Sequence, residues 1–183
     1  EALDPLVTAL AGLSGLTQES MIRGVGWRFI EMDKRIERAL QTITTVRGLI
    51  APVCGEMEQV TLLNALLNSM EVLITYRRRG RERRGIELGL DLVLLDTANP
   101  RSLIFQLERL QEHLVELPNT AGTSGELDEE SRALLEATTT LKLTRLPHLL
   151  KVHDSRRTEL DTLMTQLAGL LREFSRMISD KHF

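Results

Sequence analysis

Residues 26–45 read GWRFIEMDKRIERALQTITT, and this stretch decides the fold. At about 100° per residue, its large apolar side chains fall in one stripe along a helix. The stripe consists of Phe29, Met32, Ile36, Leu40, Ile43 and, beyond the stretch, Ile50. Asp33 and Glu37 lie along one border of the stripe, and Trp27 lies on the opposite side. The pattern predicts a long helix with neighbours on more than one side.

A shorter copy of this pattern follows at residues 99–114, NPRSLIFQLERLQEHL. Its apolar stripe consists of Leu103, Leu107, Leu110 and Leu114. Both segments carry a Glu-Arg pair in the middle of an apolar helix, namely Glu37-Arg38 and Glu108-Arg109. Phe105 precedes Arg109 by one helical turn, so the ring and the guanidinium can stack. Two copies of one pattern indicate a duplicated helical unit.

The composition restricts the class of protein. The chain has 183 residues, which predicts a single domain over 1–183, and it is 42% hydrophobic but only 3% aromatic, a mixture typical of helical bundles. Its net charge of −3 is too small to indicate a nucleic acid or an acidic membrane as a general partner. No apolar run approaches the roughly 20 residues of a membrane span. The single cysteine, Cys54, excludes an internal disulfide and favours a reducing, cytoplasmic compartment.

The remaining elements predict about six or seven helices with short links, hence an all-α bundle. Asp4-Pro5 opens the first helix, which we expect to end at Gly15. Residues 56–79 form the next helix after the long one. Residues 86–95 are a short apolar segment that we interpret as a helix, although its pattern also fits a strand.

Start and stop signals define the later helices. Asn99 is the expected cap of the second Glu-Arg helix, and Asp128 restarts the chain as a helix after a loop rich in Gly, Ser and Thr. Pro147 kinks or ends that helix, and Asp154 or Ser155 opens the last one. The last helix carries a heptad-like seam of Leu160, Leu163, Leu167, Leu170, Phe174 and Met177. Such a seam either docks along another helix or joins two copies in a homo-oligomer.

Catalytic and metal-binding signals are weak. None of the four histidines, at positions 113, 148, 153 and 182, has a glutamate three residues before it, as a di-iron carboxylate bundle requires. Cys54 lies in a Pro/Gly turn with no histidine nearby in sequence, so we interpret it as a small apolar thiol. No glycine-rich phosphate loop is present. We therefore expect no cofactor, no metal and no catalytic residue.

The arginine-rich segment 77–84 is the strongest charge feature, with six arginines in eight positions. One interpretation is a solvated helix end with a few salt bridges. The other is a surface for a phosphate, a nucleic-acid backbone or an acidic partner. Only Tyr76 accompanies the arginines, so base stacking is unsupported and nucleic acid is an unfavoured partner.

The Glu-Arg pairs have two interpretations as well. The structural one is an interhelical ion-pair network of Asp33, Glu37, Arg38, Glu108 and Arg109. Like charges four residues apart, as in Asp33 and Glu37, disfavour an isolated helix and call for cations on a neighbour. The functional interpretation is a catalytic or ligand-binding constellation.

A separate hypothesis concerns Arg28 and Arg101. These two arginines and the helix start at Asn99 can converge as an anion site, because helix N-termini favour anions.

Several blocks, taken together, resemble a known family. They are SMIRGVGWRF at 20–29, RIERA at 35–39, TYRRR at 75–79, DLVLLD at 91–96 and NPRSLIFQLERL at 99–110. In this order they resemble the Alpha-E family, a bacterial all-helical domain named for its Glu-Arg motif. The likeness is strongest over residues 20–118. Gly80 departs from the family pattern, where a bulkier residue is expected after Arg79.

The resemblance implies a partner protein more than an enzyme. Alpha-E domains occur beside, or fused to, circularly permuted ATP-grasp proteins, and near transglutaminase-like proteins. This implies a role in an ATP-dependent system that forms peptide or amide bonds, with no catalytic residue to carry over. The family usually has further helices before this point, so we expect residues 1–183 to be the C-terminal part of a longer chain.

Two main hypotheses follow. In the first, the chain is a non-catalytic helical module that binds an ATP-grasp-type ligase, a transglutaminase-like protein or a peptide substrate. Its exposed surface for an anionic partner would consist of Arg28, Arg101, Arg77, Arg78 and Arg79. In the second, the chain is an enzyme with acid/base carboxylates in an interhelical cleft, namely Asp33, Glu37 and Glu108. Binding of nucleic acid through residues 77–84 is a third, weaker alternative.

Overall fold

The computed structural model of the chain describes residues 3–80, 85–118 and 127–183. Its regular elements within these ranges are all helices, which confirms the predicted all-α bundle. They are α1 (Asp4–Ser20), α2 (Val25–Leu49), α3 (Glu56–Ser69), α4 (Leu73–Arg79), α5 (Ile86–Leu90), the π-helix η1 (Asp91–Leu95), α6 (Leu103–Val115), α7 (Glu129–Lys142), α8 (Leu146–Leu149) and α9 (Thr158–His182). In this part of the chain, no helix is long and apolar enough to span a membrane.

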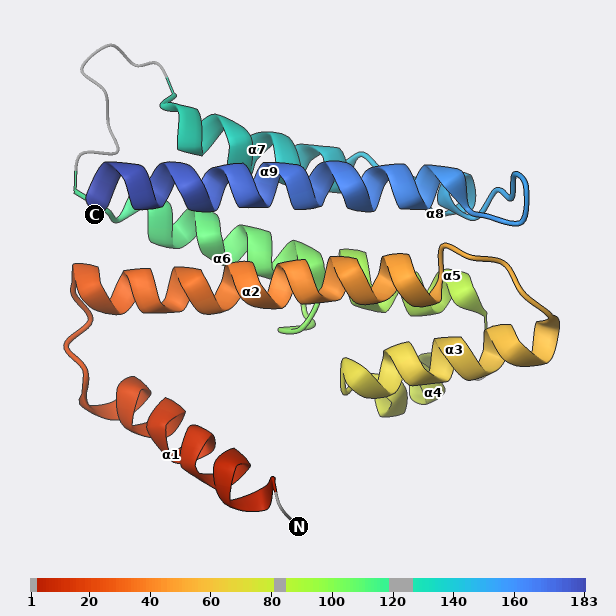
Figure 1. Cartoon of the computed structure of the whole chain (residues 1–183), viewed down its shortest axis with the longest axis horizontal. Coiled ribbons are helices and arrows are strands. Elements are labelled where there is room, and N and C mark those ends of the chain that lie inside the picture. Colours follow the sequence, from red (N-terminus) through yellow and green to blue (C-terminus); the bar gives the residue numbers. More distant parts are fainter. Residues whose placement is uncertain (1–2, 81–84, 119–126) are drawn as a thin grey trace.

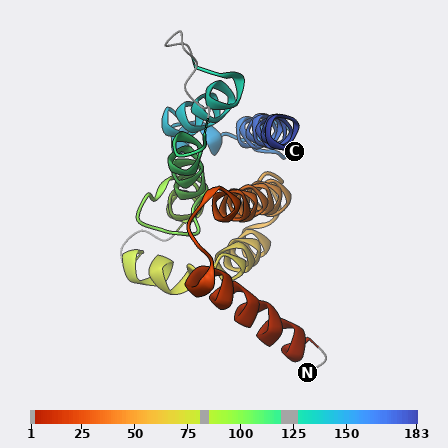
Figure 2. The same ribbon diagram turned by 90° about the vertical axis from the view of Figure 1, so that its left-hand side faces the viewer.

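Four helices form the body of the molecule (Figure 1). Helix α2 packs against α6 and α9, and α7 packs against the same two helices from the other side, so the four close a ring of contacts. Figure 2 looks along this bundle. The core between the helices is made mainly of leucine, and its side chains with no exposed surface include Leu66, Leu67, Leu90, Leu92, Leu94, Leu103, Leu107, Leu110, Leu160 and Leu167. The apolar stripes read from the sequence therefore do face the interior.

The seam of the last helix is used within the chain. Leu160, Leu163, Leu167 and Phe174 are buried, and α9 packs along α7 and α2. Of the two interpretations of this seam, docking along another helix of the same chain is the one that the structure shows.

The short helices α3, α4, α5, η1 and α8 gather at the end of the bundle where α2 finishes (Figure 1). Here the prediction of one helix over residues 56–79 is wrong, because α3 ends at Ser69 and α4 begins at Leu73. Glu71, between them, has a φ of 54°, in the left-handed region that an α-helix does not use. The segment 86–95 is helical, as expected, and continues from α5 into η1.

Two helix starts differ from the prediction. Ser102, not Asn99, caps α6: its Oγ accepts a hydrogen bond from the backbone N–H of Phe105 at 3.2 Å. The Asn99 side chain instead accepts from the Arg101 N–H at 3.0 Å and donates to the carbonyl of Leu92 at 2.7 Å. Asn99 therefore builds the turn before the helix, as asparagine commonly does.

The last helix likewise begins later than expected, at Thr158. Asp154 and Ser155 have φ values of 47° and 59°, which an α-helix cannot include. Backbone bonds between His153 and Arg156, at 2.8 and 2.9 Å, close them into a turn. By contrast, Asp128 does cap α7, accepting from the Ser131 N–H at 3.2 Å.

The two remaining boundaries also need correction. Helix α1 continues past Gly15 to Ser20. Helix α7 ends at Lys142, and Pro147 lies in the first turn of α8 instead of kinking α7. Proline is tolerated in a first turn because its missing N–H would have no helical partner there.

A buried arginine connects three segments at the end of the body where α2 finishes. Arg157, only 5% exposed, donates to the carbonyls of Ile50 at 2.6 Å and Pro52 at 3.3 Å. It also donates to the side chain of Gln59 at 2.9 Å. The end of α2, the start of α3 and the start of α9 are thus held by one guanidinium.

Helix α1 lies outside this body (Figures 1 and 2). None of its described residues is buried, and the apolar line predicted for it is exposed, with Leu6 at 55%, Leu10 at 56% and Leu13 at 62%. An isolated helix of this length is marginal in water, and Gly12 and Gly15 each weaken it by roughly 1 kcal/mol relative to alanine.

Candidate anion-binding cleft

A polar cleft of about 570 Å³ lies at the end of the bundle where α2 begins and α6 finishes. One wall comes from α2, with Trp27, Arg28, Glu31 and Arg35. Residues 27, 31 and 35 are spaced by four, so the helix places them above one another on one face. Their face is distinct from the apolar stripe that packs into the core.

The other wall comes from α6, with Arg109, Glu112, His113 and Glu116. The two helices run antiparallel, so low numbers on α2 meet high numbers on α6. Arg28 accordingly pairs with Glu116 at 3.1 Å, and the rings of Trp27 and His113 meet edge to face with centroids 5.4 Å apart. Gln18 of α1 and Arg23 of the following link complete the lining.

Glu31 is the anchor of the cleft, and it is only 4% exposed. Its Oε1 accepts hydrogen bonds from Gln18 and Lys34, both at 3.0 Å. Its Oε2 faces Arg35 at 3.6 Å. A buried carboxylate needs such partners, because an unpaired one would lose its hydration without compensation. Through Gln18, Glu31 also ties the end of α1 to the body.

Two guanidinium groups meet at the base of the cleft. Arg35 and Arg109 lie 5.7 and 5.1 Å from the centre of the Phe105 ring, which confirms the predicted contact between Phe105 and Arg109. Arg35 also donates to the side chain of the buried Gln106 at 3.3 Å. One aromatic ring thus makes cation–π contacts with arginines from two different helices.

Several polar atoms in this region lack a hydrogen-bond partner although they are buried. They are Trp27 Nε1, Arg35 Nε, Arg109 Nε and His113 Nδ1, out of seven such side-chain atoms in the described part of the chain. Buried polar groups are normally paired, and each orphan costs about 1–3 kcal/mol. Three of the four are N–H donors, so the site is short of acceptors. An acceptor-rich group, such as an anion, would match it.

Electrostatics in the cleft favour neutral histidine and bound anions. Burial lowers the pKa of His113, and the positive charges of Arg35 and Arg28 lower it further. Burial also lowers the pKa of Arg35, partly offset by Glu31, but a guanidinium remains charged in any case. The cleft therefore presents cations and N–H donors around a neutral imidazole at physiological pH.

The carboxylate of Glu31 is held in place by its neighbours. Both oxygens of Glu31 are engaged by neighbours, so Glu31 is not available as a general base. In the described ranges, no group of three or more His, Cys, Asp or Glu side chains is placed to hold a metal ion.

The Glu-Arg pairs occupy different environments. Glu37 and Arg38 of α2 are exposed, as is Asp33, and among the described residues none of the three makes an ion pair. Glu108 pairs with Lys142 at 2.9 Å and so links α6 to α7. Arg109 lines the cleft and pairs with Glu112 on its own helix at 2.6 Å. The five residues predicted as one network are thus not brought together.

The arginines predicted to bind an anionic partner are also separated. Arg28 lies at the end of α6 and Arg101 lies before its start, about 20 Å away along 13 residues. Arg101 pairs with Glu71 at 2.6 Å. The predicted convergence of Arg28, Arg101 and Asn99 is therefore wrong, because the helix itself holds them apart.

The arginines of α4 belong to the opposite end of the bundle. Arg79 pairs with Asp96 at 2.8 Å, whereas Arg77 and Arg78 are exposed. The rest of the predicted cluster, residues 81–84, lies outside the described residues.

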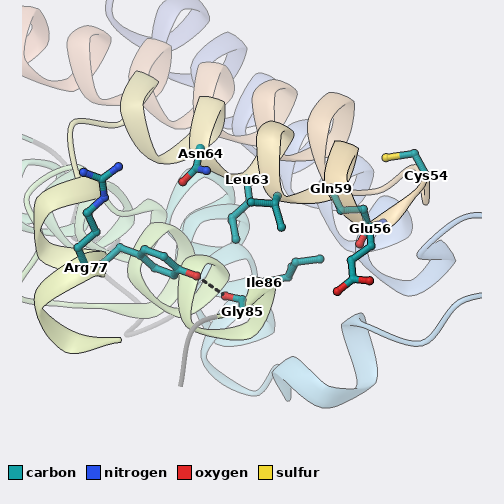
Figure 3. Close-up of a pocket in the computed structure, with 10 residues that line it drawn as sticks. Cys54, Glu56, Gln59, Leu63, Asn64, Arg77, Gly85 and Ile86 are labelled. Atoms are coloured by element: carbon teal, nitrogen blue, oxygen red, sulfur yellow. Dashed lines mark hydrogen bonds between the residues drawn. The ribbon is translucent and has the colours of Figure 1, made fainter. Parts of the chain in front are cut away.

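Figure 3 shows a second pocket, of about 750 Å³, between α3, α4 and the start of α5. Arg77 stands at its edge, and Leu63 and Ile86 contribute apolar surface. The hydroxyl of Tyr76 donates to the carbonyl of Gly85 at 3.4 Å. This pocket is chiefly apolar, and it offers no cluster of charged groups comparable to the cleft.

Cys54 lies at the far end of this second pocket (Figure 3). Burial, with the neighbouring Glu58, raises the pKa of its thiol. A thiol with a raised pKa is a poor nucleophile at neutral pH.

The sequence-based prediction of site residues missed eight of the ten cleft residues: Gln18, Arg23, Trp27, Glu31, Arg35, Glu112, His113 and Glu116. A signal was present, because positions 27, 31 and 35 repeat every four residues on α2. Arg109 with His113 repeats the same spacing on α6. The predicted network instead contained Glu37 and Arg38, which lie almost two turns further along α2.

The sequence was compared with protein families and with known proteins. The sequence model of the Alpha-E family, described as a predicted alpha-helical domain with a conserved ER motif, matches residues 1–183. Uncharacterised proteins of Mycobacterium tuberculosis and Mycobacterium bovis are each 32% identical to the chain over 168 residues, which is 91% of this chain and 19% of each relative. The chain thus spans about a fifth of the length of the curated relatives it matches. No solved structure matches it.

Proposed function

The chain belongs to the Alpha-E family, and from this premise we propose that it is a non-catalytic helical module of an ATP-dependent system that forms peptide or amide bonds. It works with an ATP-grasp-type ligase, in the cytoplasm, and binds either the ligase or the ligase's peptide substrate. A transglutaminase-like protein is the other partner that this setting suggests. The single observation that supports binding is the polar cleft between α2 and α6.

The cleft supports this role because its buried carboxylate is fully hydrogen-bonded while several of its N–H donors are not. The buried carboxylate of Glu31 is saturated by its neighbours, whereas the indole N–H of Trp27 and the Nε–H of Arg35 and of Arg109 have no partner among the described residues. Arg23 lies over the Trp27 ring at 5.4 Å and, among the described residues, pairs with no carboxylate. Such a site is prepared to receive an anionic group from another molecule.

Helix α1 supports a protein partner. Its exposed leucines form a face that is apolar along its length, and its charged residues between Asp4 and Ser20 are acidic only. We propose that the ligase covers this face with an apolar surface edged by lysine or arginine. The end of α1 also borders the cleft through Gln18, so a ligase docked on α1 would stand next to a peptide held in the cleft.

The alternative of an independent enzyme receives less support. Its proposed acid/base groups do not share a cleft, since Asp33 borders a groove against α9 and Glu108 is tied to Lys142. Glu37 is exposed elsewhere on α2. Separate carboxylates cannot act on one bond.

The test is ATP turnover by the partner ligase with its peptide substrate, measured with and without this chain. We expect no turnover by the chain alone and at least a threefold stimulation of the ligase. Arg109→Ala should remove the stimulation, whereas Arg172→Ala, an exposed arginine of α9 outside the cleft, should retain it. Turnover of ATP by the chain alone, or a ligase indifferent to it, would refute the proposal.

A further inference from the structure

The charge of the cleft restricts what it can hold. Its lining has four arginines, at positions 23, 28, 35 and 109, and three glutamates, at positions 31, 112 and 116, which leaves one cation in excess. His113 adds no charge when neutral. A single negative charge balances these lining residues, and Lys34, which pairs with Glu31 at 3.0 Å just beside them, adds one more positive charge. Inorganic phosphate at neutral pH is a mixture of its mono- and dianion, and the dianion carries one negative charge more than the lining residues balance.

The ion pairs at the rim are easily exchanged. Glu112 is 55% and Glu116 60% exposed, and their arginine partners are Arg109 and Arg28. Exposed pairs of this kind contribute about 0–1 kcal/mol, so a ligand can replace the glutamates at little cost. A planar carboxylate that takes their place can accept two parallel N–H bonds from one guanidinium fork. Glu31, which is buried, stays where it is.

The displaced glutamates can then contact the ligand themselves. Once released from Arg28 and Arg109, the carboxylates of Glu112 and Glu116 can accept hydrogen bonds from N–H donors beside the incoming group. A peptide has an amide N–H next to its terminal carboxylate, whereas a simple anion such as acetate has none. The volume of about 570 Å³ lies in the usual range of ligand sites.

We infer that the cleft binds a peptide through one carboxylate, held by Arg23, Arg28 and Arg109 beside the indole of Trp27, with the adjacent amide N–H donating to Glu112 or Glu116. This inference rests on the proposed function and names the chemical class that the module recognises. The carboxylate comes either from the C-terminus of the peptide or from an aspartate or glutamate side chain. The chemistry of the two sources is the same, and the experiment separates them.

The assay uses the fluorescence of Trp27, the sole tryptophan of the chain. Four probes are titrated into the full chain: acetyl-trialanine with a free carboxylate, the same peptide amidated, amidated acetyl-Ala-Glu-Ala, and inorganic phosphate. We expect at least one carboxylate peptide to bind at least tenfold more tightly than the amidated trialanine and than phosphate. Preference for the first or the third probe identifies the source of the carboxylate.

The variants test the assigned contacts. Arg109→Lys keeps the charge but loses the fork, and should weaken the carboxylate peptide at least fivefold without changing the melting temperature. Arg23→Ala, at an exposed position, should weaken it similarly, and Arg172→Ala should not. Equal binding of the acid and amide peptides, or tighter binding of phosphate, would overturn the inference. If the ligase is still stimulated in that case, the proposed function survives and only the ligand class is wrong.

Discussion

Glu31→Gln makes the sharpest test of the cleft, because two properties should change in opposite directions. The substitution keeps the size of a side chain that is 4% exposed but removes its charge. Lys34 and Arg35 then lose the carboxylate that they share. The amide nitrogen of glutamine, moreover, cannot accept the hydrogen bonds that the carboxylate oxygen accepted.

The loss of stability can be worked out from the exposure of the partners. Removing one member of a fully buried ion pair costs about 3–5 kcal/mol. The side chains of Lys34 and Arg35 are 38% and 20% exposed, so water compensates part of that cost. We expect a loss of about 2 kcal/mol in the free energy of unfolding, or about 4–8 °C in Tm for a chain of this size.

Binding should change the other way. Without Glu31, the excess of cations around the cleft rises from one to two. At an effective dielectric constant of about 20, one charge in the wall of the cleft contributes on the order of 1 kcal/mol, which is about a fivefold tighter binding of a carboxylate peptide. Stability and affinity are thus predicted to separate in a single variant.

Urea denaturation and the Trp27 titration measure the two effects, with Asp33→Asn as the matched control. Asp33 lies on the same helix, bears the same charge and is exposed. We expect the control to change the free energy of unfolding by less than about 0.5 kcal/mol and the affinity by less than twofold. Equal losses of stability in both variants, or weaker binding in Glu31→Gln, would refute the reasoning.

Three further predictions concern other parts of the molecule. Arg157→Ala leaves the carbonyls of Ile50 and Pro52 without a donor and should cost about 3 kcal/mol in urea unfolding, whereas a loss below about 1 kcal/mol would contradict its anchoring role. Hydrogen bonds from two arginines hold the pKa of Asp161 at about 2, below its value in the unfolded chain. The stability that Asp161 adds is therefore complete above about pH 4 and is lost as the pH falls toward 2. The free energy of unfolding, measured from pH 5 to pH 2.5, should depend less on pH in Asp161→Asn than in the parent protein. Leu10→Glu on α1 should change the melting temperature of the body by less than about 2 °C but abolish stimulation of the ligase, and an undiminished stimulation would exclude α1 as the docking face.

The sequence predicted those parts of the fold that depend on periodicity. The stripes of α2 and α6 follow directly from spacings of three and four, and Met32, Ile36 and Leu107 are buried as expected. Helix ends were less predictable, because they depend on local turns. Asn99 and Ser102 are both good caps, and only the hydrogen bond to Leu92 shows that Asn99 is used by the turn instead.

The candidate site was only partly predictable, for a reason that concerns tertiary packing. On an isolated α2, Glu31 and Glu37 are both acidic residues outside the apolar stripe, and nothing in the sequence shows which of them a neighbouring helix covers. Glu31 is buried in the cleft between α2 and α6, where Gln18 of α1 also contacts it, whereas Glu37 meets solvent. The stacking of Phe105 on Arg109 lies within one helix and could be read from the sequence. The contact of Arg35 with the same ring joins two helices and could not.

A crystal structure of the chain with a carboxylate-bearing peptide is the most direct test of the cleft as a binding site. We predict that the carboxylate lies about 2.7–3.2 Å from guanidinium nitrogens of Arg109 and Arg28, with the Glu112 and Glu116 side chains turned toward the peptide backbone. A peptide seated elsewhere, such as in the pocket beside Tyr76, with the pairs of Arg28 and Arg109 undisturbed, would contradict it.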